Sequence, residues 1–143
     1  MQKNHRFAII ASRFNSEIVD RLIRGAQSAF QQSGIPFADI PIIHVPGAFE
    51  IPLAAKRAAQ SGRFDALIAI GCVIRGETAH FEYISHWVST GIGQVALETG
   101  IPVAFGVLTA YSDEQVMERS AADKENKGFE AAMSAIEMAG LTI

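Results

Sequence analysis

The residues with the clearest chemical potential lie in one continuous segment, from Gly71 to Phe81. This segment leaves an apolar run, passes through a turn and reaches a predicted helix start. Backbone N–H groups at a helix start have no partners within the helix, so they attract anions. His80 falls in the first helical turn, where an imidazole can donate or accept a proton beside a bound anion. The segment therefore predicts an anion site next to a proton-transfer residue, as in an active site.

Four other side chains have types that suit a binding site. Glu50 begins a predicted helix, where the helix dipole stabilises any carboxylate, and it also suits hydroxyl groups on a ligand. Phe14, between polar neighbours, either closes the core or offers a ring face for stacking. Arg119 and Lys127 are either a solvated pair or ligands for phosphate. From the residues alone, these alternatives remain open.

The other reactive residue types have simpler interpretations. Thr78 is expected to be the N-cap of the helix that follows it. Cys72 is the single cysteine and is interpreted as a small core residue at a strand end. His5, His44 and His86 are interpreted as structural. No zinc-ligand pattern, Walker sequence or dinucleotide fingerprint occurs in the chain.

Apolar runs alternate with segments of helical periodicity, and these elements must position the reactive residues. Strands are expected at 7–11, 40–45, 66–70 and 103–108, with Pro41 indicating an edge position or a late start for the second. Helices are expected at about 16–33, 51–61, 79–99, 113–121 and 126–139. This order predicts one α/β domain over 1–143: a three-layer α/β/α sandwich around a four-stranded parallel sheet, of the flavodoxin-like type.

Ligands of open parallel sheets bind beyond the carboxyl ends of the strands. That rule brings four segments together at one edge: 12–15, 46–50, 72–80 and 109–110. The rule predicts where a ligand binds and leaves its identity open.

Composition excludes several classes of function. The net charge is −3 and the basic residues are scattered, which argues against nucleic acid as a partner. No apolar run approaches the ~20 residues that cross a bilayer, and the first six residues contain no signal-peptide core, so a cytoplasmic location is expected. Hydrophobic residues make up 49% of the chain, which fits either an alanine-rich core or surface buried between subunits.

Several segments together resemble one enzyme family. They include Arg13-Phe14-Asn15, Val45-Pro46-Gly47-Ala48-Phe49-Glu50-Ile51-Pro52 and the stretch from Gly71 to Phe81, followed by 97–103, 105–109, 114–115, 118–119, 126–128, 130–132 and 135–138. In this order they resemble the 6,7-dimethyl-8-ribityllumazine synthases of riboflavin biosynthesis. The resemblance covers nearly the whole chain and implies condensation of 5-amino-6-(D-ribitylamino)uracil with 3,4-dihydroxy-2-butanone 4-phosphate, without a cofactor.

The resemblance also implies roles for individual positions. His80 matches the proton-transfer histidine, Phe14 the residue that stacks on the pyrimidine, and Glu50 the carboxylate that binds ribityl hydroxyls. Asn15 shapes the stacking loop, and Arg119 matches the phosphate-binding arginine. The remaining positions implied to contact substrate are Ala48, Phe49, Val73 and Ile74 in the pocket lining, Glu77 and Thr78 in the phosphate turn, and Phe105, Lys127 and Glu130.

In the family, Phe105, Arg119 and Lys127 reach the pocket from the adjacent subunit, so the resemblance implies a pentamer with shared sites. Many members have a small residue in place of Glu77, and we expect this carboxylate to turn towards Arg75 or solvent. The segment 120–125 lacks the Gly-Thr-Lys-x-Gly pattern of members that form sixty-subunit shells, so a free pentamer is expected. A ring-binding scaffold without catalysis is the main alternative, and a riboflavin synthase of the archaeal kind is a weaker one.

Overall fold

The computed structural model describes residues 4–143, and the expectation of no signal segment rests partly on residues 1–3, outside that range. The described chain contains one sheet of parallel strands in the order β2-β1-β3-β4. The strands are β1 Phe7–Ser12, β2 Ile42–Val45, β3 Ala66–Ile74 and β4 Val103–Ala110. The α-helices are α1 Ser16–Gln32, α2 Ile51–Gln60, α3 His80–Thr99, α4 Asp113–Arg119 and α5 Lys127–Ala139, with 3₁₀ turns η1 Phe37–Asp39 and η2 Ala48–Glu50.

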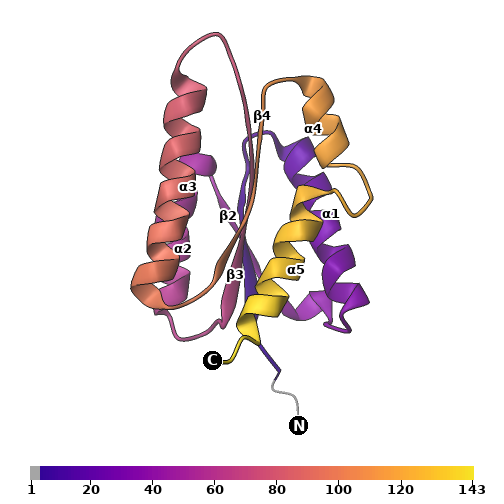
Figure 1. Cartoon of the computed structure of the whole chain (residues 1–143), viewed down its shortest axis with the longest axis vertical. Helices are drawn as coiled ribbons and strands as arrows, with labels where there is room; N and C mark the ends of the chain where they lie inside the picture. The colour runs from indigo at the N-terminus through magenta and orange to yellow at the C-terminus, as the bar shows by residue number, and fades with distance from the viewer. Residues whose placement is uncertain (1–3) are drawn as a thin grey trace.

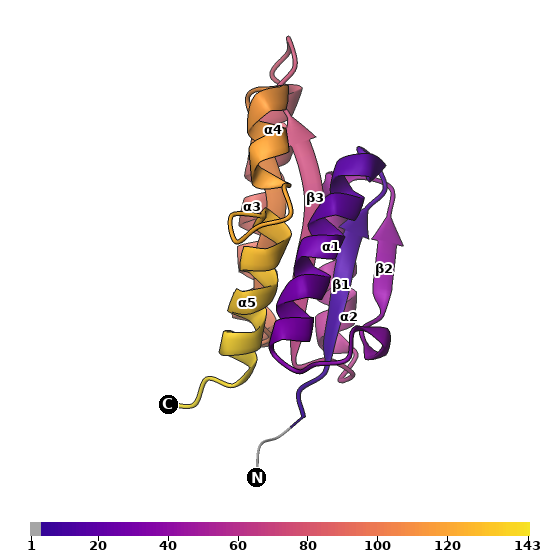
Figure 2. The ribbon, with the colours of Figure 1, turned by 90° about the vertical axis from the view of Figure 1, so that its right-hand side faces the viewer.

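Helices cover both faces of this sheet. In Figure 1, α2 and α3 lie on one side of the strands, and α1, α4 and α5 lie on the other. The strands β1, β2 and β3 point toward the same end in Figure 2, and the start of β1 and the C-terminus lie toward the opposite end. The expected α/β/α sandwich of the flavodoxin-like type is therefore confirmed.

The strand β1 shows why a short apolar run predicts a central strand. All six of its residues are buried. Because successive side chains point to opposite faces, Phe7 and Ile9 pack in the core under α1 and α5, whereas Ala8 and Ile10 pack under α2 and α3. A strand that contributes to both cores needs apolar residues at every position.

Two element boundaries differ from the expectation in ways that affect the site. The sequence pattern predicts that β3 ends at Ile70, but the strand continues to Ile74, because Gly71 to Ile74 pair with β4. The following helix starts at His80, against an expected start at about position 79. The glycine at position 71 permits the strand to continue, since a Cβ atom there would lie 3.0 Å from Ser12 Oγ and 3.2 Å from Ile51 Cδ1.

Other boundaries shift by smaller amounts. The strand β2 starts late, at Ile42, and lies at the sheet edge, as Pro41 indicated. The helix α4 ends at Arg119 rather than at position 121. Within residues 4–143, no helix combines the length and apolar character that crossing a membrane requires.

Candidate active site

The loop after β1 is fixed to its neighbours at the carboxyl edge of the sheet. The Arg13 N–H donates to Val45 O at 2.8 Å, and the Phe14 N–H donates to Pro46 O at 3.2 Å. Asn15 Nδ2 donates to the carbonyl oxygen of Cys72 at 3.0 Å. The Phe14 side chain is 70% exposed, so it does not close the core. Of the two interpretations of Phe14, closing the core or offering a ring face for stacking, only the second fits this exposed position.

The turn after β2 is closed by the carboxylate predicted to bind a ligand. Glu50 Oε1 accepts a hydrogen bond from the Gly47 N–H at 3.0 Å, within the turn η2. Ala48 is buried in this turn, whereas Phe49 is exposed. A carboxylate that accepts one backbone hydrogen bond keeps further lone pairs for a ligand hydroxyl. Glu50 is therefore both a structural part of the turn and a possible acceptor for substrate.

The segment between β3 and α3 differs from the expectation at Thr78. The N-cap of α3 is Ala79, without a side-chain cap, so the prediction of Thr78 as N-cap is wrong. The Thr78 hydroxyl nevertheless accepts from the His80 N–H at 3.3 Å. The strand β3 extends four residues further than expected and carries Val73 and Ile74 up to this loop.

Arg75 and Glu82 pair beside this loop, and Glu77 takes no part in the pair. Glu77 is exposed. Arg75 instead forms a 3.9 Å ion pair with Glu82, and its guanidinium lies 5.5 Å from the centre of the Tyr111 ring. Of the two orientations expected for Glu77, the exposed one is found. His80 is exposed at the start of α3, where the first backbone N–H groups of the helix have no partners within it.

Phe105, Lys127 and Glu130 form a second group, away from the loops at the carboxyl edge. Lys127 Nζ lies 3.9 Å from Glu130 Oε2 and 5.8 Å from the centre of the Phe105 ring. The ion pair joins neighbouring turns at the start of α5, where a carboxylate is also stabilised by the helix dipole. Arg119 is the exposed last residue of α4.

The sheet register separates these two groups within one chain. Phe105 pairs with Ala69, whereas the carboxyl end of the same ladder pairs Val73 with Thr109. Four residues of strand correspond to about 13 Å. Phe105 also lies on the edge strand β4, while Phe14 and Glu50 follow β1 and β2 on the other side of β3. One chain therefore does not place the Phe105 and Lys127 pair beside Phe14 and Glu50.

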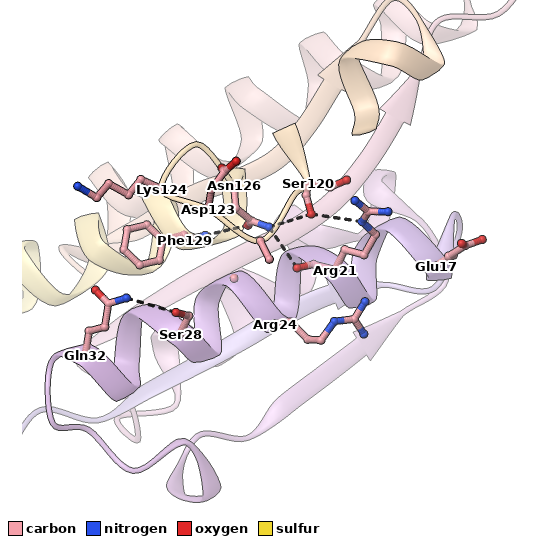
Figure 3. Close-up of a pocket in the computed structure, with 12 residues that line it drawn as sticks. Glu17, Arg21, Arg24, Ser28, Gln32, Ser120, Asp123, Lys124, Asn126 and Phe129 are labelled. Carbon is pink, nitrogen blue, oxygen red and sulfur yellow. Dashed lines mark hydrogen bonds between the residues drawn. The ribbon is translucent and has the colours of Figure 1, made fainter. Parts of the chain in front are cut away.

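A hollow of about 510 Å³ between α1 and the α4–α5 connection has none of the predicted site residues in its lining (Figure 3). The buried Asn126, 1% exposed, organises one wall of this hollow. Its Nδ2 donates to Arg21 O, Ser120 O and Ala121 O at 3.0–3.3 Å, and its Oδ1 accepts from the backbone N–H groups of Gly128 and Phe129. The side-chain polar atoms of Asn126 therefore bond to the backbone of α1, of the α4–α5 connection and of α5.

Asn126 is a residue whose importance the sequence pattern does not reveal. Its side chain bonds to the carbonyl groups of Ser120 and Ala121, just after Arg119, and to the Gly128 N–H in the first turn of α5, beside Lys127. Its signal in the sequence is an asparagine two residues before Gly128, at a helix start. Trp87 is a second such residue: its Nε1 donates to Phe49 O at 3.0 Å.

Cys72 has no features of a nucleophile. Its side chain is 2% exposed, and burial raises the pKa of the thiol from 9.0 to about 11. A thiolate is the reactive form, so this environment opposes reactivity. Among residues 4–143, no group of three histidine, cysteine or acidic side chains is arranged to hold a metal ion.

The chain has an open parallel sheet with aromatic and polar loops at the carboxyl ends of its strands, the edge at which α/β proteins of this type bind ligands. A family model described as 6,7-dimethyl-8-ribityllumazine synthase matches residues 4–142. The chain belongs to this family, which is a family of transferase enzymes.

Proposed function

We propose that the chain condenses 5-amino-6-(D-ribitylamino)uracil with 3,4-dihydroxy-2-butanone 4-phosphate to give 6,7-dimethyl-8-ribityllumazine, phosphate and water. The observation that carries the proposal is the joining of three loops at one sheet edge. Asn15 ties the exposed Phe14 to the end of β3, and Glu50 closes the neighbouring turn. The family match over residues 4–142 supports the same reaction.

The reaction needs positioning and proton transfers. The primary amine of the pyrimidine attacks the ketone and gives an imine with loss of water; phosphate is then eliminated, and the second amine closes the ring with loss of water. Holding both reactants together can lower such a barrier by up to ~7–11 kcal/mol in ideal cases. General acid–base catalysis typically adds ~10²–10⁴-fold.

The residues have distinct roles in this proposal. Phe14 stacks on the pyrimidine, Glu50 accepts from the ribityl hydroxyls, and His80 moves the protons of the imine and elimination steps. The backbone of Ala48, Phe49, Val73 and Ile74 lines the pocket. Glu77 and Thr78 offer backbone N–H groups and a hydroxyl to the phosphate, with the Glu77 carboxylate directed away.

Arg119 and Lys127 supply the positive charge for phosphate, with Phe105 and Glu130 holding Lys127 in place. Because one chain separates Phe105 and Lys127 from Phe14 and Glu50, we propose that these two residues, together with Arg119, act in the site of an adjacent subunit. Head-to-tail contacts of this kind close into rings, and the ring proposed here is the pentamer that the family resemblance implies, of about 77 kDa from chains of 15.4 kDa.

An absorbance assay of lumazine formation from the two substrates tests the reaction. Appearance of the product band with equimolar phosphate release supports the proposal. A purified chain that binds the pyrimidine tightly and releases no phosphate is a ring-binding scaffold, and the proposal is then wrong.

Shared sites are tested by mixing two impaired variants, Arg119→Ala and His80→Ala, after dissociation and reassembly. Mixed rings contain some sites with both native residues, so activity is expected to return. Light scattering on the same sample reports whether rings formed. Mixed rings of the correct mass without recovered activity contradict shared sites.

A further inference from the structure

Trp87, the single tryptophan of the chain, connects α3 to the turn that carries Glu50. Its indole Nε1 donates to Phe49 O at 3.0 Å, and its ring lies 5.5 Å from the Phe49 ring with an interplanar angle of 32°. The side chain is 40% exposed, so its burial alone does not account for this position. An indole N–H is only a donor, and here it satisfies a carbonyl of η2.

The close approach of the two elements depends on Gly91, one helical turn after Trp87. A Cβ atom at Gly91 would lie 2.7 Å from Pro52 Cγ and 2.8 Å from Pro52 Cβ. Pro52 stands in the first turn of α2, which follows η2 directly. The α3 backbone therefore rests on the start of α2, and this contact brings Trp87 within reach of Phe49 O.

The same face of α3 carries His80 at the helix start. Residues 80 and 87 are seven positions apart, so they lie on one face about 10.5 Å apart along the axis. Glu50 follows Phe49 and closes η2 through its bond to the Gly47 N–H. Trp87 thus joins the helix that carries His80 to the turn that carries Glu50.

We propose that Trp87 is a positioning residue: its hydrogen bond to Phe49 O holds the 48–50 turn against α3, so that the ribityl-binding carboxylate keeps its place relative to His80. The inference rests on the proposed function. The proposal predicts that loss of this bond weakens binding of the pyrimidine substrate, whose ribityl chain Glu50 binds, and changes binding of the butanone phosphate little.

The test uses Trp87→Phe in the assembled enzyme, because phenylalanine keeps a ring against Phe49 and lacks the N–H donor. The expected result is a rise in KM for the pyrimidine of about threefold to tenfold, the loss expected for one neutral hydrogen bond. The KM for the butanone phosphate is expected to stay within about twofold, since the bond supports the turn that carries Glu50 and not the residues assigned to the phosphate. Tyr83→Phe is the matched control, since Tyr83 is an exposed aromatic residue of the same helix and its hydroxyl bonds nothing in the part of the chain described.

An unchanged KM for the pyrimidine overturns the proposal, and so does an equal rise in both KM values or the same rise in Tyr83→Phe. A second measurement avoids turnover. The dissociation constant of the pyrimidine, measured by titrating it alone into the wild type and into Trp87→Phe, should rise by the same factor as its KM, and an unchanged dissociation constant overturns the proposal. Failure of the proposed function is distinct, because the wild-type enzyme then forms no lumazine.

Discussion

Asn15 and Cys72 are 57 residues apart in the chain, yet Asn15 Nδ2 donates to the Cys72 carbonyl oxygen at 3.0 Å. Asn15 has a φ of 61°, in the left-handed region that asparagine tolerates better than most residues. The bond spans from the loop after β1 to the carboxyl end of β3. Phe14 immediately precedes this fixed point, so its exposed ring is held at the sheet edge through its neighbour.

Replacing Asn15 is expected to loosen that loop. Asn15→Ala loses the hydrogen bond, which is worth about 0.5–1.5 kcal/mol. It also places an alanine in the left-handed region, where the clash of its Cβ atom with the backbone costs about 1–2 kcal/mol more. Asn15→Gly loses only the bond, so it is the control for backbone strain. Denaturant unfolding of both variants measures the difference. Equal stability of the two would show that the backbone relaxes at this position.

His80→Ala is expected to slow turnover but leave measurable activity. Positioning of the two reactants survives the change, whereas acid–base assistance, typically ~10²–10⁴-fold, is lost. Steady-state lumazine formation measures the effect. His44→Ala is the control, because His44 is exposed on the edge strand β2. Complete loss of activity in an assembled variant that still binds both substrates would show that proton transfer dominates.

Arg119→Ala is expected to raise the KM for the butanone phosphate by at least about tenfold, because a guanidinium binds phosphate through two parallel hydrogen bonds. The KM for the pyrimidine should change much less. Titrating each substrate at saturating levels of the other separates the two effects. Arg24→Ala removes an exposed arginine of α1 that lines the hollow in Figure 3, and it should alter neither value. An unchanged KM for the butanone phosphate in Arg119→Ala would remove that residue from the phosphate site.

The parts of this fold that local patterns determine were predictable. Phe7 to Ala11 is apolar at every position, which only a strand between two cores requires, and Pro41 marks the late start of β2. The exposed Phe14 and the half-buried Glu50 also fall where the carboxyl-edge rule places them.

The parts that depend on distant residues were not predictable. The strand β3 passes Gly71 because β4 offers paired backbone up to Ala110, which local propensity does not encode. The cap of α3 was also missed, because the helix starts at His80 with Ala79 and not Thr78 at the cap position. Trp87 and Asn126 act through carbonyl groups of other elements, so their partners exist only once the chain has folded.

Cys72 gives the chain an alkaline sensitivity of defined sign. Burial raises the pKa of its thiol from 9.0 to about 11, so the folded state holds this proton over a range in which the unfolded chain releases it. The contribution to stability is therefore complete below pH 9 and is lost as pH rises toward 11. The difference in unfolding free energy between the wild type and Cys72→Ala should shrink over that window. At mildly alkaline pH, iodoacetamide should alkylate the folded chain at least about a hundredfold more slowly than the unfolded chain, and equal rates would contradict the buried thiol.

Gly128→Ala is expected to destabilise the protein, because the start of α5 lies directly against the backbone of α1. A Cβ atom at Gly128 would overlap the carbonyl oxygen of Leu22 in α1, and a helix backbone cannot move aside as a side chain can. Overpacking of this kind costs about 1–3 kcal/mol. Lys127 precedes Gly128, so the displaced helix start should also weaken use of the butanone phosphate.

Gly93→Ala is the matched control for Gly128→Ala. Gly93 lies within α3, and a Cβ atom there would meet nothing within 4 Å. Alanine is favoured over glycine in a helix by about 1 kcal/mol, so Gly93→Ala should be neutral or slightly stabilising. Denaturant midpoints of the two variants, measured with the same assembly state, give the comparison. If the midpoints of both variants rise, α1 and α5 can move apart without loss of stability. The close contact between Gly128 and Leu22 then does not hold Lys127 in place.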